Sequence, residues 1–257
     1  MLGAFSLAPA PSLDIISPHP AKTTHLPPRR TGQTLPPAPT WPDSSAASPV
    51  ARAAVAQEFA NLRYEGHCPL GMYIVPASDN LFVWDGVLFV HQGYYTDSIL
   101  KFRLIFPVNY PDRAPDVHFI TDVFHPLIAQ QDGAFNIASR FRPWRPKEHH
   151  VYDVLHWLKA AFKKHALDDI KEIDCLNKEA FRLYHDSTSS FAALATQSSM
   201  LSQLASSLFD QDHPSMANNG PVHGIQFKEL RPEESAALRQ RLGLTDWDEE
   251  PAGGEAV

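Results

Sequence analysis

Few residues of this sequence stand at spacings that support catalysis. The only two cysteines are Cys68 and Cys175, and a cysteine is a useful nucleophile only when its thiolate is accessible near neutral pH. Among the thirteen histidines, His149 and His150 are adjacent rather than four residues apart, as a zinc-binding helix would require. Neither a phosphate-cradling glycine loop nor a Gly-x-Ser-x-Gly elbow is present. The sequence therefore predicts no metal site and no cofactor.

Residues 105–146 have the most distinctive spacing in the chain. Three prolines follow a predicted strand end and, with their fixed φ and missing N–H, predict a rigid turn; they are Pro107, Pro111 and Pro115. Val117 and Phe119 then alternate with polar neighbours, which predicts another strand. After it come His125-Pro126, a long turn that closes at Asp132-Gly133, and the pair Trp144 and Pro146.

At these residues the chain resembles the ubiquitin-conjugating enzyme family. The matching positions stand in the family's order and at its spacing; they are Tyr110, Pro111, Pro115, His125, Pro126, Gly133, Trp144 and Pro146. The resemblance implies structural roles for them, and for His125 a role in holding the turn. We also expect the Tyr110-Pro111 peptide bond to be cis, given the tight proline turn.

Two positions depart from the family pattern. Asn136 stands three residues after Gly133, where the family has its catalytic cysteine, and Leu127 stands where the family has the asparagine of a His-Pro-Asn triplet. A neutral carboxamide cannot carry ubiquitin as a thioester. Leucine has no hydrogen-bond donor for an oxyanion. In other enzymes, removal of such a donor costs about 3 kcal/mol of transition-state stabilisation. The resemblance therefore implies an inactive variant and not an enzyme.

One alternative keeps catalysis and places it on another thiol. Cys175 could act as the nucleophile of an unconventional ligase, which predicts a reducible ubiquitin adduct that is lost in Cys175→Ala. However, Cys175 lies 39 residues beyond Asn136, past a complete predicted helix. A free cysteine is more often a small packed hydrophobe. Cys68 precedes the first predicted strand and has no stronger claim.

The composition excludes several classes of function. The net charge of -7 and the scattered 22 Lys and Arg argue against binding to nucleic acid, which needs a clustered basic face. Two cysteines make a disulfide framework improbable and fit a reducing, cytoplasmic setting. The sequence contains no run of 18 apolar residues, and its first 20 residues lack a basic start and are broken by prolines. We therefore expect neither a membrane span nor a signal peptide, and only indirect contact with membranes.

The hydrophobic pattern predicts an α+β fold of the ubiquitin-conjugating type, with an N-terminal helix, a four-stranded antiparallel meander and C-terminal helices. The helix is expected at residues 50–65, and the strands at 71–76, 81–90, 99–106 and 117–121. In the third strand Leu100, Phe102 and Leu104 share one face, while Lys101 and Arg103 share the other. We expect that second face to be solvated.

Four segments are expected. Residues 1–49 hold 11 of the 23 prolines and predict a disordered arm, which serves either as a docking site for an aromatic-grooved domain or simply as a linker. Residues 50–210 form the variant domain. Residues 211–243 form an extension with a strand-like segment at 225–227 and a short helix that begins at Pro232. Residues 244–257 form an acidic tail.

Helical spacing returns at residues 151–162, from Asn177 onward, and along residues 187–209. The last of these stretches is uncharged and rich in serine. It indicates either contact with a partner protein or an ordinary amphipathic helix with a solvated serine-rich side. The candidate partner-binding residues are Phe191, Leu201, Leu208, Phe227 and Leu238.

Within the inactive variants, residues 50–210 look like the Fused Toes family, also called the AKT-interacting protein family. The likeness rests on residues 80–90, His125-Pro126-Leu127, residues 140–145 and Leu208-Phe209-Asp210. It implies a scaffold that joins a Hook-type coiled-coil adaptor to a Hook-interacting protein and links early endosomes to dynein for microtubule transport. The alternative is a variant that binds ubiquitin and assists an active conjugating enzyme in chain formation. Either implies a cytoplasmic protein, in the first case peripheral on early endosomes.

Overall fold

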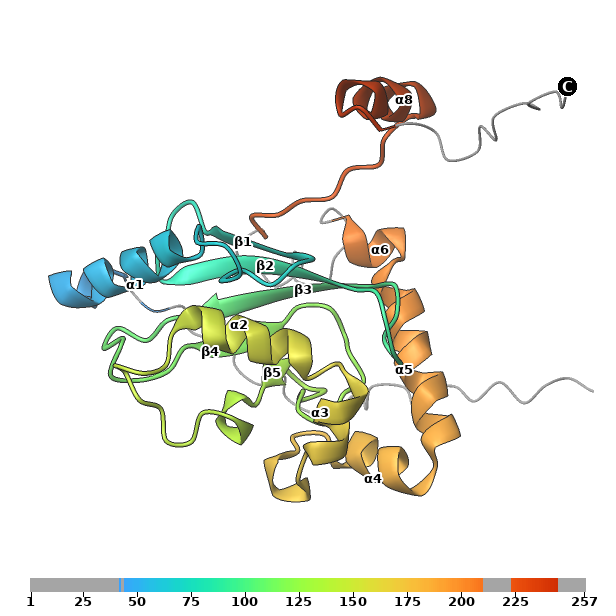
Figure 1. The fold of residues 1–257 in the computed structure, drawn as a ribbon, viewed down its shortest axis with the longest axis horizontal. Coiled ribbons are helices and arrows are strands. Elements are labelled where there is room, and N and C mark those ends of the chain that lie inside the picture. Colours follow the sequence, from blue (N-terminus) through green and yellow to red (C-terminus); the bar gives the residue numbers. More distant parts are fainter. Residues whose placement is uncertain (1–41, 43, 210–222, 245–257) are drawn as a thin grey trace, which may run out of the picture. The chain divides into compact units, whose positions relative to one another are not determined.

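A computed structural model describes residues 42, 44–209 and 223–244. Within them the chain forms an N-terminal helix, an antiparallel sheet and C-terminal helices, as the sequence predicts (Figure 1). The predicted acidic tail and most of the predicted proline-rich arm lie outside the described residues. The last residues of that arm are described and belong to the domain: η1 spans Ser44–Ala46, and Ala47 is buried in the core. No helix of the described part is long and apolar enough to cross a membrane.

The N-terminal helix α1 spans Pro49–Asn61 and begins where the sequence predicts. Ser48 is its N-cap, with the side-chain oxygen accepting a hydrogen bond from the Ala51 N–H at 3.0 Å, and Pro49 occupies the first turn. The helix ends four residues earlier than expected, at Asn61, ahead of Gly66, which has a φ of +79°. Val55 anchors the helix in the core.

The sheet of the described residues has five strands, one more than predicted, in the order β1-β2-β3-β4-β5. The first four are β1 Met72–Pro76, β2 Val83–Val90, β3 Ser98–Ile105 and β4 Asp116–Phe119. The fifth, β5 Ala134–Phe135, pairs with β4 through Val117↔Phe135. Because a strand of two residues has no alternation to read, the sequence could not reveal it.

The inner face of the sheet carries the core. Helix α2, Val151–Ala160, turns its apolar stripe inward, and four of its side chains are fully buried: Val151, Val154, Leu155 and Leu158. Phe102 lies under Gly86, where an added Cβ would be 2.4 Å from the phenyl ring. Glycine at that position therefore makes room for the aromatic core.

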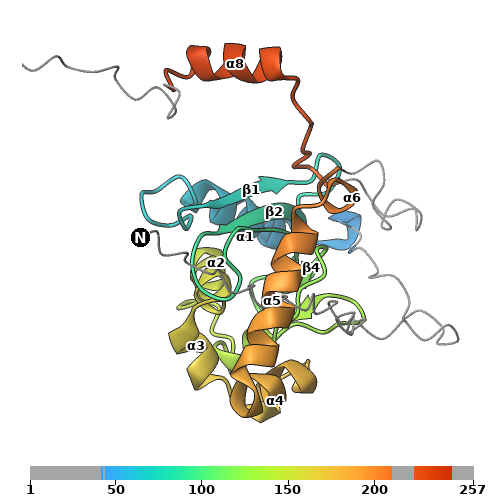
Figure 2. The same cartoon turned by 90° about the vertical axis from the view of Figure 1, so that its right-hand side faces the viewer.

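The helices after α2 are α3 Lys164–Asp169, α4 Lys178–Asp186, α5 Thr188–Ser202, α6 Ala205–Leu208 and α8 Pro232–Arg241. Asn177 caps α4 as predicted, whereas α3 had no predicted counterpart. The uncharged stretch is two helices rather than one (Figure 2). Its expected solvated serine side is wrong in part, because Ser199 and Ser202 are buried and hydrogen-bond Ser98 and the Ile99 N–H at the start of β3.

The outer face of the sheet differs most from the expectation. Lys101 and Arg103, predicted to face solvent, are 1% and 7% exposed. Residues 223–227 contact this face at Asp85 and Lys101, and the Leu208 carbonyl also binds Lys101, so this part of the predicted extension packs on the domain. Residues 225–227 form no strand. The helix predicted from Pro232 is present as α8, and Glu234 caps it by accepting from the Arg231 N–H at 3.2 Å.

Candidate functional site: the turn around Asn136

The proline turn that precedes the site is tied to two other elements. The Tyr110-Pro111 peptide bond is cis, as predicted, and Arg142-Pro143 is also cis, which was not predicted. The Tyr110 hydroxyl donates to Glu58 Oε1 of α1 at 3.0 Å. The Trp144 indole N–H donates to the Pro111 carbonyl at 2.8 Å. Tyr110 and Trp144, which the sequence motif places 34 residues apart, thus brace the same turn.

Glu58 is a structural position of the site that the sequence did not reveal. Its buried carboxylate also accepts from the Val151 N–H at 3.1 Å, and His150 Nδ1 lies 3.1 Å from Oε1. One side chain therefore joins α1, the proline turn and the first residue of α2. Burial, together with the charge of Glu58, raises the pKa of Tyr110 well above its usual value. Alternation and motif spacing carry no signal for such a contact.

His125 has the structural role that the resemblance implies. Its Nδ1 accepts the Leu127 N–H at 3.0 Å, so the ring is neutral and carries its proton on Nε2, which donates to the Ala161 carbonyl at 3.0 Å. Complete burial lowers the pKa of this imidazole to about 4. The hydrogen bond to Ala161 raises the pKa, but by less than burial lowers it. His125 thus links the turn to the end of α2 and is not available for proton transfer near neutral pH.

Asn136 has both polar ends of its side chain occupied. Oδ1 accepts the Ala138 N–H at 3.0 Å and caps the short helix η2, Ile137–Ser139, while Nδ2 donates to the Asp174 carbonyl at 2.8 Å. Leu127, whose carbonyl accepts the Asn136 N–H at 2.9 Å, is fully buried. Asn136 therefore holds together two segments that lie 38 residues apart in the sequence.

Gly133 turns the chain toward Asn136 in a conformation that only glycine fits. Its φ is +73°, and an added Cβ would lie 2.0 Å from the Phe119 carbonyl oxygen. Pro126 of the motif is buried, and its carbonyl accepts the Asn177 N–H at 2.9 Å. Pro115 directly precedes β4, and Pro146 lies in the loop before α2.

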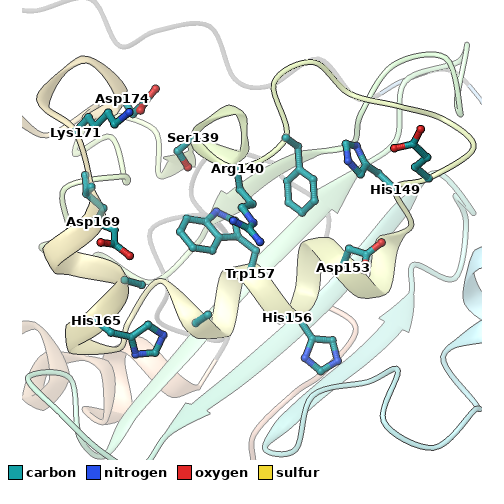
Figure 3. Close-up of a pocket in the computed structure, with 15 residues that line it drawn as sticks. Ser139, Arg140, His149, Asp153, His156, Trp157, His165, Asp169, Lys171 and Asp174 are labelled. Atoms are coloured by element: carbon teal, nitrogen blue, oxygen red, sulfur yellow. The ribbon is translucent and has the colours of Figure 1, made fainter.

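A cavity of about 840 Å³ lies beside Asn136. Ser139 and Asp174, both hydrogen-bonded to Asn136, form part of its wall. Trp157 projects from α2 toward the middle of the lining residues (Figure 3), and its buried Nε1 has no protein acceptor. The lining contains acids, bases and three histidines, but no group in the described part of the chain is placed to hold a metal ion. The cavity can therefore accept a polar group.

Cys175 lies much closer to the site than its place in the sequence suggests. Its neighbour Asp174 contacts Asn136, so the fold brings this thiol near the site although Cys175 lies 39 residues beyond Asn136 in the sequence. The thiol is nevertheless a weak nucleophile, because it is buried and donates to the Lys171 carbonyl at 3.2 Å. Burial, helped by the charges of Asp174 and Glu172, raises its pKa to about 11. Burial also raises the pKa of Cys68.

The candidate partner-binding residues do not form one surface. Phe191 is wholly buried against Tyr95 and Tyr184, so its prediction as a partner contact is wrong for this fold. Leu201 and Leu238 are exposed. Leu208 and Phe227 come together around one side chain, since Lys101 donates to the Leu208 carbonyl at 2.6 Å and lies 5.4 Å from the Phe227 ring.

Comparison with known proteins finds a match to the family model described as "Ubiquitin-conjugating enzyme" over residues 54–199, more than half of the chain. The chain is 32% identical to "Protein crossbronx-like" of Drosophila mojavensis over 187 residues, 69% of this chain and 70% of that protein. It is 35% identical to "AKT-interacting protein" of Danio rerio, covering 66% of this chain and 57% of that protein. It is 29% identical to "Protein AKTIP homolog" of Nematostella vectensis, of which the match covers 54%.

Proposed function

The chain belongs to the ubiquitin-conjugating enzyme family and, within it, to the relatives of AKT-interacting protein and crossbronx, and from this premise we propose that it is a non-catalytic variant that acts as an adaptor between proteins. Its partners are a Hook-type coiled-coil adaptor and a Hook-interacting protein. In this complex it links early endosomes to dynein and resides in the cytoplasm, peripheral on the endosome.

The geometry of Asn136 carries the non-catalytic part of the proposal. At the position that the resemblance assigns to the catalytic cysteine, an amide caps η2 with its oxygen and binds the Asp174 carbonyl with its nitrogen. A carboxamide cannot form a thioester, and its two hydrogen bonds make it part of the local structure. The buried Leu127 offers no donor to an oxyanion, and the high pKa of Cys175 disfavours a substitute thiolate.

The surface of α5 supports the adaptor part. The uncharged helix α5 exposes Met200 (64%) and Leu201 (40%) near its C-terminal end, and Leu204, which precedes α6, is 49% exposed. Exposed apolar groups next to one another are typical of protein contacts. The printed name of one relative, AKT-interacting protein, likewise describes a protein that binds another protein.

The catalytic question is tested by incubation with ubiquitin-activating enzyme, ubiquitin and ATP, with an active conjugating enzyme as the positive control. We expect no thiol-sensitive ubiquitin conjugate on the wild-type chain and none on Cys175→Ala. A conjugate that reducing agent removes, and that Cys175→Ala abolishes, would establish the unconventional ligase instead. The same adduct on both proteins would instead indicate that Cys68 carries the ubiquitin.

The adaptor question is tested by a pull-down with the carboxy-terminal region of a Hook protein. We expect the wild-type chain to be retained, and the double variant Met200→Asp/Leu204→Asp to bind at least about tenfold more weakly because charge is placed in an apolar contact. Gln197→Asp, one turn earlier on the exposed side of α5, is the matched control and should bind normally. Absence of any association with the wild-type chain would count against the adaptor.

The cavity beside Asn136 favours a second candidate function. Its volume of about 840 Å³ and its polar lining leave room for a segment of another protein. In this alternative the chain binds ubiquitin and assists an active conjugating enzyme. Addition of the chain to such an enzyme should then change the rate of linkage-specific chain formation, and Trp157→Phe, which removes the unsatisfied indole N–H, should reduce the effect. If chain formation does not change, this second function is excluded and only the adaptor function remains.

A further inference from the structure

Residues 223–227, here named the C-terminal strap, lie on the outer face of the sheet. The face beneath them contains charged side chains: Asp85 on β2 and Lys101 and Arg103 on β3. All three are buried, at 1%, 1% and 7% exposed. Charged residues are rarely buried unless they are paired, and the strap supplies partners to two of these three side chains, Asp85 and Lys101.

The first anchor of the strap is Asp85. Arg103 Nε donates to Asp85 Oδ1 at 2.6 Å, and the Gly224 N–H donates to the other oxygen, Oδ2, at 2.8 Å. The buried His223 Nε2 donates to the Phe102 carbonyl at 3.3 Å and lies 3.6 Å from Asp85 Oδ1. A Cβ on Gly224 would lie 3.2 Å from Asp85 Oδ2 and from Val75 Cγ1, so the strap fits closely at this point.

The second anchor is aromatic. The Phe227 ring lies 5.4 Å from Lys101 Nζ and 6.3 Å from the Phe89 ring of β2, which it meets edge to face. Between the anchors, the side chain of Gln226 is exposed. The strap thus engages the sheet at both ends, through backbone and imidazole groups at 223–224 and through a phenyl ring at 227.

The side chains of the covered face suit it both when the strap covers it (closed) and when the strap has left it (open). A carboxylate, a guanidinium and an ammonium group are the side chains of an ordinary solvated sheet face. If the strap left, water would reach the Asp85 oxygen that the Gly224 N–H now binds, while Lys101 would keep its hydrogen bond to the Leu208 carbonyl. When the strap is in place, the Gly224 N–H satisfies the carboxylate oxygen that Arg103 does not reach through Nε. Burial of an ion pair contributes little net stability, so the closed state is held chiefly by the anchors.

We propose that the outer face of the sheet is a peptide-binding surface, and that its resident occupant is the strap of the same chain, which keeps the face closed to other proteins. A competing ligand would be an extended segment with a small residue at the Gly224 position, whose backbone N–H reaches Asp85, and an aromatic residue at the Phe227 position. The face opens only when the strap is displaced. This surface is distinct from the end of α5 and from the cavity beside Asn136.

The cover is tested on the full chain by NMR-detected amide exchange. In the wild type, the Gly224 amide should exchange at least about tenfold more slowly than in a free peptide. In His223→Ala/Phe227→Ala it should approach the free-peptide rate, while the Leu104 amide in β3 stays protected and shows that the sheet is intact. Gln226→Ala is the matched control and should behave as the wild type. Fast Gly224 exchange in the wild type, or unchanged protection in the double variant, overturns the proposal.

A second variant and a peptide separate release of the strap from a general loss of fold. Gly224→Val should release the strap through collision with Asp85 and Val75 without touching the aromatic anchor. A peptide with the sequence of residues 221–229, added at roughly millimolar concentration, should shift the Asp85, Lys101 and Arg103 amide signals in the released variants only. A peptide with valine in place of the glycine should not. Equal shifts in wild type and variants, or none in any protein, would refute a strap-occupied binding surface.

Discussion

Removal of the Glu58 carboxylate should weaken the fold more than any change on the exposed surface of α1. Glu58→Ala leaves the Tyr110 hydroxyl and the Val151 N–H buried without an acceptor; these groups now donate to Glu58 at 3.0 and 3.1 Å. Each unsatisfied buried donor costs about 1–3 kcal/mol. We therefore expect the free energy of unfolding to fall by about 3–5 kcal/mol.

The measurement is urea unfolding of the full chain followed by circular dichroism, compared through the midpoint and the slope. Gln57→Ala is the matched control, because Gln57 is exposed on the same helix and bonds only Asn61 at 2.9 Å. It should change the stability by less than about 0.5 kcal/mol. Tyr110→Phe removes one donor and, combined with Glu58→Ala, should give a double-mutant coupling of at least about 1 kcal/mol.

Two results would refute this reasoning. A loss of less than about 1 kcal/mol in Glu58→Ala would mean that water replaces the carboxylate without difficulty. Strict additivity of Glu58→Ala and Tyr110→Phe would mean that the two side chains do not interact in solution. In either case the link between α1, the proline turn and α2 would not be the one that the structure shows.

Three further predictions concern the turn around Asn136. Gly133→Ala should lower the free energy of unfolding, measured by urea titration, by at least about 2 kcal/mol because the added Cβ overlaps the Phe119 carbonyl. Gly66→Ala is the control: its φ of +79° is similar, but an added Cβ would have no atom within 4 Å, so the same titration should show a loss of only about 1 kcal/mol. The folded-state pKa of His125 is lowered from 6.5 to about 4, so the unfolded chain binds the proton more readily. The free energy of unfolding should therefore be unaffected by this group above pH 6.5 and should fall by up to about 3 kcal/mol as the pH falls toward 4. His125→Asn should abolish that loss. Alkylation of Cys175 by iodoacetamide at pH 7, followed by mass spectrometry, should be at least about tenfold slower than that of a free cysteine peptide, because its pKa of about 11 leaves little thiolate; equal rates would contradict this.

Much of the fold can be predicted from local patterns. The cap at Ser48, the alternation along β3 and the apolar stripe of α2 each depend on neighbouring residues, and these three elements are present within a few residues of their expected bounds. The cis bond at Tyr110-Pro111 is likewise predicted, from the tight proline turn. Local geometry determines these features, so the sequence is enough to identify them.

The candidate site was predicted less completely. The motif located Asn136 and Leu127 but could not show that Asp174, 38 residues on, accepts the Asn136 amide, or that Glu58 holds the proline turn. For the same reason the sequence separates Cys175 from the site and predicts Phe191 at a surface, whereas the fold brings Cys175 near Asn136 and buries Phe191 in the core. These relations arise from contacts between segments that no short-range pattern connects.

The residues alone determined the two-sided character of β3, with apolar groups on one face and Lys101 and Arg103 on the other. They could not determine that the charged face is covered, because the strap that covers it lies more than 100 residues later in the chain. A periodic sequence specifies which side chains share a face, since that depends only on the pleat of the strand. Burial depends on which distant segment packs there, and only the tertiary structure decides it.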